Sequence, residues 1–168
     1  MHTEKQKKKD ITVQITNSFH ALDASLPKLK KLVKTICNRF AKYEIPNTGY
    51  EVTIAIVDDA QIRKVNKQFL NHNLSTDCLS FDLSDDAPNS AKSFELLVNA
   101  EMARKQAKRR GHSTEAELAL YITHALLHNL GFDDTTQNQA KKMHHTEDEI
   151  LQQLDYGLVY NKAVKAQK

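Results

Sequence analysis

Two histidines four residues apart, followed by a glycine and an acidic pair, restrict the fold of this chain more than any other feature. The pattern is HxxxHxxGxxD, formed by His124, His128, Gly131 and Asp134. Residues four apart lie one above the other on a single face of an α-helix, so both imidazoles can point at one metal ion. Gly131 favours the left-handed conformation that ends a helix, and the chain can then turn back and bring Asp134 to the same ion. Three such ligands leave a fourth position open, as in catalytic rather than structural zinc sites.

The helix that carries the histidines allows a second interpretation, in which both are hydrogen-bonded core residues. Zinc peptidases carry a glutamate directly after the first histidine as general base, and this chain has Ala125 there, so a peptidase is not expected. A helix that is apolar nearly all round is expected to be buried, where polar groups need partners, and this favours ligation over the core interpretation. Its apolar residues are Leu118, Leu120, Tyr121, Ile122, Ala125, Leu126 and Leu127.

Three further histidines could complete a metal site. His144 and His145 are adjacent on a predicted helix, about 100° apart around it, so at most one of them can face the ion. His112 precedes the metal-site helix. Asp134 falls where a third ligand is needed, and we predict one Zn²⁺ held by His124, His128 and Asp134.

Two upstream segments extend the pattern into a family resemblance. They are residues 76–81, with the sequence TDCLSF, and residues 96–103, with the sequence LLVNAEMA. With the histidine run, they resemble the YbeY-type endoribonucleases, or rRNA maturation factors, whose signatures are HGxLHLxGYDH and TDVLSFP. The resemblance extends over about residues 52–154. It implies a zinc-dependent, single-strand-specific endoribonuclease that acts in rRNA maturation, at the 3′ end of small-subunit rRNA, and in ribosome quality control.

The chain departs from these signatures at three positions. Asp134 stands where the family has its third histidine, and Ala125 replaces a glycine. Leu70 stands where the common form of the family has an arginine linked to RNA and catalysis, and His72 is a candidate catalytic residue in its place. The change at Leu70 favours an alternative function, a non-catalytic assembly factor of the small ribosomal subunit with a structural metal. A metallohydrolase of another substrate is a third possibility.

Composition predicts one globular domain over residues 1–168. The chain is 40% hydrophobic and 27% charged, with no apolar run long enough for a membrane helix. The N-terminus has charge but no apolar segment behind it, so we expect no secretory signal and a cytoplasmic location. Cys37 and Cys78 have no CxxC spacing and are expected to be small buried residues. The ends, about residues 1–9 and 161–168, are predicted to be flexible.

Basic residues gather in two places although the net charge is only +3. One is an N-terminal arm, and the other is a predicted helix that leads into the metal-site helix. A solvated helix face is the simpler interpretation of such a charge run. Because neighbouring cations repel and a phosphate would relieve that repulsion, we predict RNA as partner, with ribosome-associated proteins also possible. The arm contains Lys5, Lys7, Lys8 and Lys9, and the helix contains Arg104, Lys105, Lys108, Arg109 and Arg110.

Apolar periodicity predicts an α+β fold. With the resemblance, we expect a small mixed sheet of about four strands packed with helices and a zincin-like metal helix. Thr114 and Glu117 are expected to form a capping box at the start of that helix. Asp77, before the third strand, is interpreted first as a turn residue bonded to its own backbone and second as an active-site residue. Strands are expected at 11–16, 51–57, 79–83 and 94–98, and helices at 29–40, 58–69, 100–110, from 114 onward and at 136–154.

Overall fold

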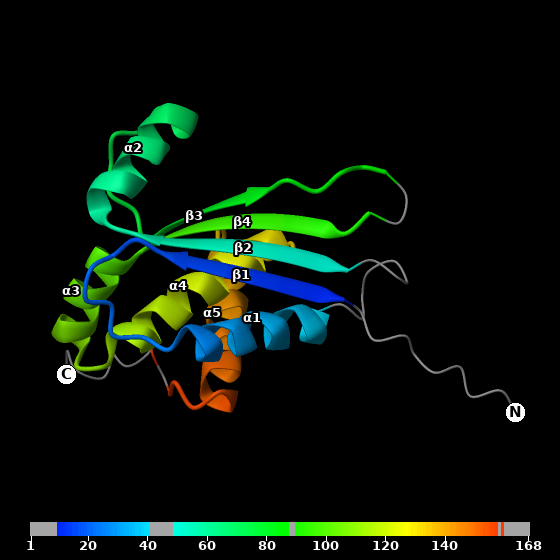
Figure 1. The fold of residues 1–168 in the computed structure, drawn as a ribbon. Coiled ribbons are helices and arrows are strands. Elements are labelled where there is room, and N and C mark those ends of the chain that lie inside the picture. The colour runs from blue at the N-terminus through cyan, green and yellow to red at the C-terminus, as the bar shows by residue number, and fades with distance from the viewer. Residues whose placement is uncertain (1–9, 41–48, 88–89, 158, 160–168) are drawn as a thin grey trace, which may run out of the picture.

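A mixed four-stranded sheet organises the protein (Figure 1). The computed structural model describes residues 10–40, 49–87, 90–157 and 159. Strands β1 (Ile11–Asn17), β2 (Tyr50–Val57) and β4 (Lys92–Asn99) are parallel, and β3 (Cys78–Asp82) pairs antiparallel with β4 at the edge. The order is β1-β2-β4-β3. Alternate residues of β2, from Tyr50 to Ile56, are buried on one face, which is the period of two that the sequence predicts.

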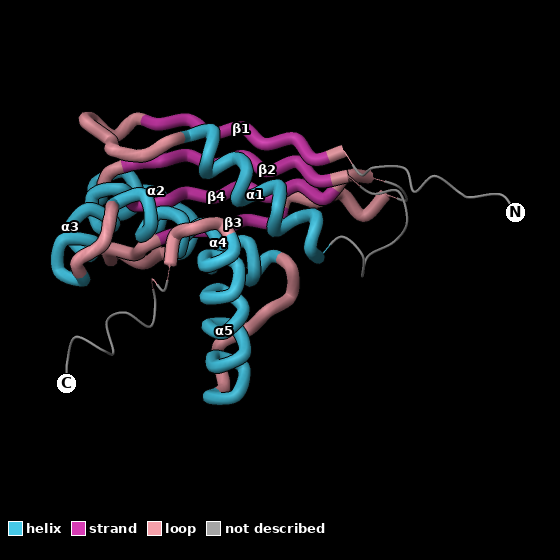
Figure 2. Tube along the Cα trace, turned by 90° about the horizontal axis from the view of Figure 1, so that it is seen from below, coloured by secondary structure: helices cyan, strands magenta, loops and turns pink. Residues whose placement is uncertain are grey.

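Helices cover the two faces of the sheet unequally. Helix α1 (Leu26–Phe40) packs against β1, and α4 (Thr114–Asn129) packs against β3 and β4 on the same face (Figure 2). Helix α5 (Gln137–Gln153) packs against α4 and extends away from the sheet. The opposite face carries α2 (Asp59–Leu70), which projects from one end of the sheet (Figure 1). The α4 side therefore holds the main core, and α2 covers a small cluster around Ile62.

Side-chain caps determine where helices α2, α3 (Ala100–Arg110) and α5 begin. Asp58 caps α2 in a capping box with Gln61, and Asn99 caps α3. Thr136 and Gln139 form a second capping box at the start of α5. These bonds satisfy backbone N–H groups that have no partner within the helix, which explains why the chain changes structure at these residues.

The predicted capping box at the start of α4 is wrong. Ser113 is the N-cap, and its hydroxyl accepts a hydrogen bond from the backbone N–H of Ala116. Glu117 is fully buried and contacts Arg110 and His112 instead. A buried carboxylate gains more from a guanidinium than from the exposed backbone N–H of a cap, so the tertiary contact prevails over the local motif.

The α+β fold and its four-stranded mixed sheet are confirmed. Helix α1 begins three residues earlier than expected, at Leu26 instead of Leu29. Cys37 is buried, as expected, whereas Cys78 is only half-buried. The basic arm at residues 1–9 and the tail at 161–168 lie outside the described residues. Among the helices that the structure describes, none is long and apolar enough to cross a membrane.

Candidate metal centre

His124, His128 and Asp134 converge on one point at the C-terminal end of α4. The two Nε2 atoms are 3.1 Å apart, and Asp134 Oδ2 lies 3.7 Å from each. Zinc binds nitrogen and oxygen ligands at about 2.0–2.2 Å, which places tetrahedral ligand atoms about 3.3 Å from one another. The three observed distances fit that arrangement, so this group could hold a metal ion.

The other nitrogen of each imidazole is already engaged. His124 Nδ1 lies 2.8 Å from Glu147 Oε1, and His128 Nδ1 lies 3.2 Å from the carbonyl oxygen of Phe132. Both partners only accept, so each Nδ1 carries the proton and donates. In neutral rings the two Nε2 lone pairs then face each other at 3.1 Å, a contact that a cation between them would make favourable.

The turn after α4 selects Asp134 rather than its neighbour. Gly131 has φ 98°, a left-handed conformation that side chains rarely adopt, and the Phe132 N–H donates back to the carbonyl of Leu127 at 2.9 Å. Asp133 Oδ1 accepts from the Asp134 backbone N–H at 2.8 Å, and this bond holds the pKa of Asp133 below its usual range. The carboxylate of Asp133 is thus used within the loop, whereas that of Asp134 faces the histidines.

Glu147 of α5 is a candidate site residue that the sequence pattern did not indicate. It is fully buried, and its two oxygens accept from His124 Nδ1 at 2.8 Å and His144 Nδ1 at 3.0 Å. Burial, the largest single effect, would lower the pKa of His124, but the bond to Glu147 together with the negative charges of Glu147, Asp77 and Asp134 raises it. The available signal was a glutamate within the apolar stripe of α5 that Met143, Ile150 and Leu151 form.

The alternative histidine ligands have other partners. His144 contacts Glu147, so it is linked to His124 through that carboxylate and is not part of the three-residue group. His145 is exposed and lies 3.3 Å from Glu149. His112 contacts the buried Glu117 at the far end of α4.

A cleft of about 410 Å³ adjoins the group on the His124 side. The elements that line it are α3, α4, α5 and the segment before β3. Asp77 lies in that segment and accepts from the Cys78 backbone N–H at 2.8 Å, which confirms the turn interpretation. Because Asp77 also lines the cleft, the second interpretation of it as an active-site residue stays a prediction.

The predicted RNA-contacting residues of α3 differ in their surroundings. Arg110 lies 3.1 Å from Glu117 and lines the cleft. Arg104 stacks over the Phe19 ring at 4.9 Å, and Lys105 lies 3.7 Å from Glu101. Lys108 and Arg109 are exposed, and neither side chain has an ion pair or ring contact with another residue that the structure describes.

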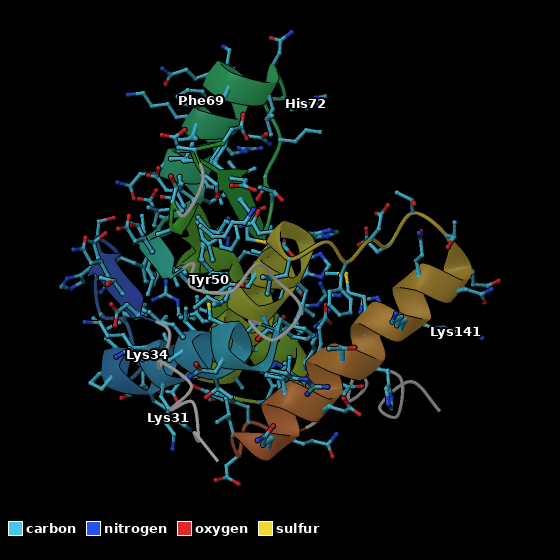
Figure 3. All side chains as sticks on the ribbon, turned by 90° about the vertical axis from the view of Figure 1, so that its right-hand side faces the viewer. Lys31, Lys34, Tyr50, Phe69, His72 and Lys141 are labelled. Atoms are coloured by element: carbon cyan, nitrogen blue, oxygen red, sulfur yellow. The ribbon has the colours of Figure 1, made fainter. Side chains whose placement is uncertain are left out.

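The candidate His72 lies away from the cleft lining. It is exposed in the segment after α2, beside Phe69 and well separated in the view from Lys141 of α5 (Figure 3). Leu70, at the position of the family's arginine, is 48% exposed. These two positions therefore face solvent on the projecting α2 end of the molecule.

Comparison with known proteins identifies the family. The model of a family described as Endoribonuclease YbeY matches residues 14–155. This chain belongs to the YbeY family. Endoribonuclease YbeY of Acetivibrio thermocellus is 32% identical over 155 residues, which cover 84% of this chain and 93% of that protein. Endoribonuclease YbeY of Caldanaerobacter subterraneus subsp. tengcongensis is 34% identical over 156 residues, 86% of this chain and 98% of that protein.

A solved structure shares the overall fold of this chain. The solution structure of TM1509 from Thermotoga maritima aligns with a TM-score of 0.54, covering 84% of this chain and 91% of that one. At 21% identity, the likeness concerns the fold alone. The family resemblance inferred from the histidine run and the two upstream segments is therefore confirmed.

Proposed function

We propose that this YbeY chain is a zinc-dependent endoribonuclease that cuts single-stranded rRNA in the cytoplasm. Its role would be maturation of small-subunit rRNA at the 3′ end and ribosome quality control. The observation that carries the proposal is the convergence of His124, His128 and Asp134 at ligand distances in a chain of this family. The relatives named Endoribonuclease YbeY support RNA as the substrate.

The donor set favours zinc over magnesium and calcium. Two imidazoles and one carboxylate suit zinc, whereas magnesium and calcium prefer sites made of oxygen atoms alone. Bound zinc would supply a Lewis acid for a phosphoryl oxygen or lower the pKa of a water molecule. The chain's own residues hold the imidazoles in position, because Glu147 and Phe132 fix the Nδ1 protons and leave both Nε2 atoms for the ion.

Phosphate contacts are proposed for the exposed cations of α3, chiefly Lys108 and Arg109. Replacing both with glutamine should weaken binding of single-stranded RNA and lower the salt dependence by somewhat less than about one unit per lost contact. The same change at Lys30 and Lys34, exposed on α1, provides a control of equal charge. An equal loss of RNA affinity in both variants would mean that the α3 cations form only a solvated helix face.

His72 remains a proposed catalytic residue. Its ring is exposed in the segment after α2, where an RNA strand crossing that end could meet it. His72→Gln should slow cleavage while the bound metal stays constant, because the ring is outside the metal group. An unchanged cleavage rate would remove His72 from the mechanism.

The deciding experiment is metal analysis of the purified full-length protein, followed by cleavage of matched single-stranded and duplex RNA with and without chelator. We expect one zinc per chain, cleavage of the single strand, loss with chelator and recovery on adding zinc. Asp134→Ala should abolish both metal and cleavage, and Asp133→Ala should retain both. Stoichiometric metal without cleavage would favour the non-catalytic small-subunit assembly factor that the change at Leu70 suggests.

A further inference from the structure

The cleft beside His124 has a composition that a substrate site for phosphate would not have. Three carboxylates line it, those of Asp77, Glu117 and Glu147, against one guanidinium, that of Arg110. Arg110 is already paired with Glu117 at 3.1 Å. Because like charges repel strongly at a partly desolvated site, a phosphate would be unfavourable here. The cleft suits a neutral group that brings hydrogen-bond donors.

Two of the three carboxylates are fully used by the protein. Glu117 contacts Arg110 and His112, and Glu147 accepts from two histidines. Asp77 differs from them. Its Oδ1 accepts from Cys78 N–H at 2.8 Å and Thr76 Oγ1 at 3.3 Å, and the Cys78 thiol also bonds to the carboxylate. A carboxylate has about four acceptor sites, so that of Asp77 keeps capacity to accept a hydrogen bond from a ligand in the cleft.

The position of Asp77 is set by the backbone. Its carbonyl accepts from the Asn99 N–H at 2.8 Å, and the Asn99 side chain donates to the carbonyl of Thr76 at 3.1 Å. Asn99 is fully buried at the junction of β4 and α3. The carboxylate is thus presented from a rigid part of the fold, as a specificity-determining group requires.

The cleft also has the size and the neighbours of a small-molecule site. Its volume of about 410 Å³ falls within the range of about 300–1,000 Å³ for ligand pockets. Met102 and Leu120 add apolar surface, and Gln106 adds an amide. His124 belongs to both the cleft and the metal group, so a group bound in the cleft lies directly beside the candidate metal position.

We propose that this cleft binds one nucleoside of single-stranded RNA, the one attached to the scissile phosphate, and that Asp77 selects bases with an exocyclic amino group. Carboxylates accept hydrogen bonds from the N4 amino group of cytosine, whereas uracil presents a carbonyl oxygen there. Proteins that read single-stranded RNA bind unstacked bases by such edge contacts. The inference rests on the proposed function, since it makes the cleft a part of the RNA site.

Cytidine and uridine are the probes, because neither has a phosphodiester bond and the zinc-loaded full-length protein cannot consume them. Amide chemical-shift titration should show cytidine binding at residues around the cleft, roughly five- to tenfold more tightly than uridine. Equal affinities, or no cytidine binding at its solubility limit, would overturn the proposal.

Asp77→Asn tests the selecting group without changing its shape. The asparagine Oδ1 still accepts from Cys78 N–H, while an NH₂ donor replaces the other carboxylate oxygen. The ratio of cytidine to uridine affinity should fall to one or below, a change that a purely structural role for Asp77 would not produce. A ratio equal to that of the parent protein would exclude Asp77 as the selector.

Gln106→Trp tests the location by filling the cleft. It should abolish cytidine binding while the zinc content stays constant, and Gln153→Trp, at an exposed position of α5, should leave both unchanged. Retained cytidine binding in Gln106→Trp would place the nucleoside elsewhere. RNA cleavage without nucleoside binding would contradict this inference but not the proposed function. Nucleoside binding without RNA cleavage would contradict the proposed function but not the binding of a nucleoside in the cleft.

Discussion

The two ends of α4 each place a buried carboxylate against histidine, yet they differ in what balances its charge. At the N-terminal end, Glu117 contacts His112 and Arg110, and the guanidinium neutralises it within the protein. At the C-terminal end, the hydrogen bonds and ion pairs of the Glu147 carboxylate are with His124 and His144 among the residues that the structure describes. At the N-terminal end the carboxylate is balanced by a guanidinium, whereas at the C-terminal end the carboxylate lies between two imidazoles.

This difference distinguishes a structural ion pair from a metal centre. A buried carboxylate without a cation is costly, and either a proton on an imidazole or a metal ion beside it lowers that cost. The Nε2 atoms of His124 and His128 meet where such an ion would lie. We therefore expect changes at the Glu117 end to alter stability alone, and changes at the Glu147 end to alter metal affinity.

The largest effect is expected for His128→Ala. Removing a direct ligand should weaken zinc binding by more than the roughly 10–100-fold that loss of an outer partner causes. The fold should survive, because the imidazole is one-third exposed. Metal content after dialysis and a thermal melt in chelator measure the two quantities. His145→Ala, an exposed histidine of α5, is the control, and stoichiometric zinc in His128→Ala would mean that the site is elsewhere.

The second-largest effect is expected at the N-terminal end of α4, where Glu117 is paired with Arg110. Glu117→Ala leaves Arg110 and His112 without their partner and should lower the free energy of unfolding by about 3 kcal/mol, the low end for a buried pair because Arg110 is partly exposed. Denaturant unfolding measures it, and zinc affinity should stay at the parent value. Glu115→Ala, in the same first turn, should cost less because its partner Lys28 is exposed. Loss of zinc in Glu117→Ala at full stability would contradict the separation of the two ends.

Glu147→Gln is expected to have a smaller effect on metal than loss of a ligand. The amide keeps the shape of the side chain but removes the charge that orients His124, so zinc affinity should fall about 10–100-fold. Competition with a chromophoric chelator gives the ratio. Glu149→Gln, on the same helix and paired with exposed Arg39, should leave the affinity unchanged. Equal affinities in both variants would reduce Glu147 to a packing role.

The sequence predicted the part of this site that is local. His124 and His128 follow from helical spacing, and the turn at Gly131 follows from the conformational freedom of glycine. Glu147 did not follow, because it reaches His124 from another helix, 23 residues along the chain. Periodicity marks its position as buried but does not name its partner.

The failed capping box has the same cause. Thr114 and Glu117 match a local rule, but the rule competes with Arg110 at the end of α3, whose approach depends on how two helices pack. The sheet order, with β4 between β2 and β3, is likewise a property of long-range pairing. Local patterns predicted the elements of the fold, and contacts between elements determined how their charged residues are used.

The smallest change is expected for Asp134→His, which restores the family's usual residue. Imidazole and carboxylate bind zinc at similar distances, about 2.0–2.2 Å, so zinc affinity should stay within roughly tenfold of the parent protein. Asp134→Ala should lose the metal, and Asp133→Ala, whose carboxylate is bonded within the loop, should keep it. If Asp133→Ala loses zinc and Asp134→Ala keeps it, the neighbouring carboxylate is the ligand. If Asp134→His weakens zinc binding more than Glu147→Gln does, the negative charge that balances the ion comes mainly from Asp134. Asp134, and not Glu147, would then be the residue that distinguishes the C-terminal end of α4 from the N-terminal end.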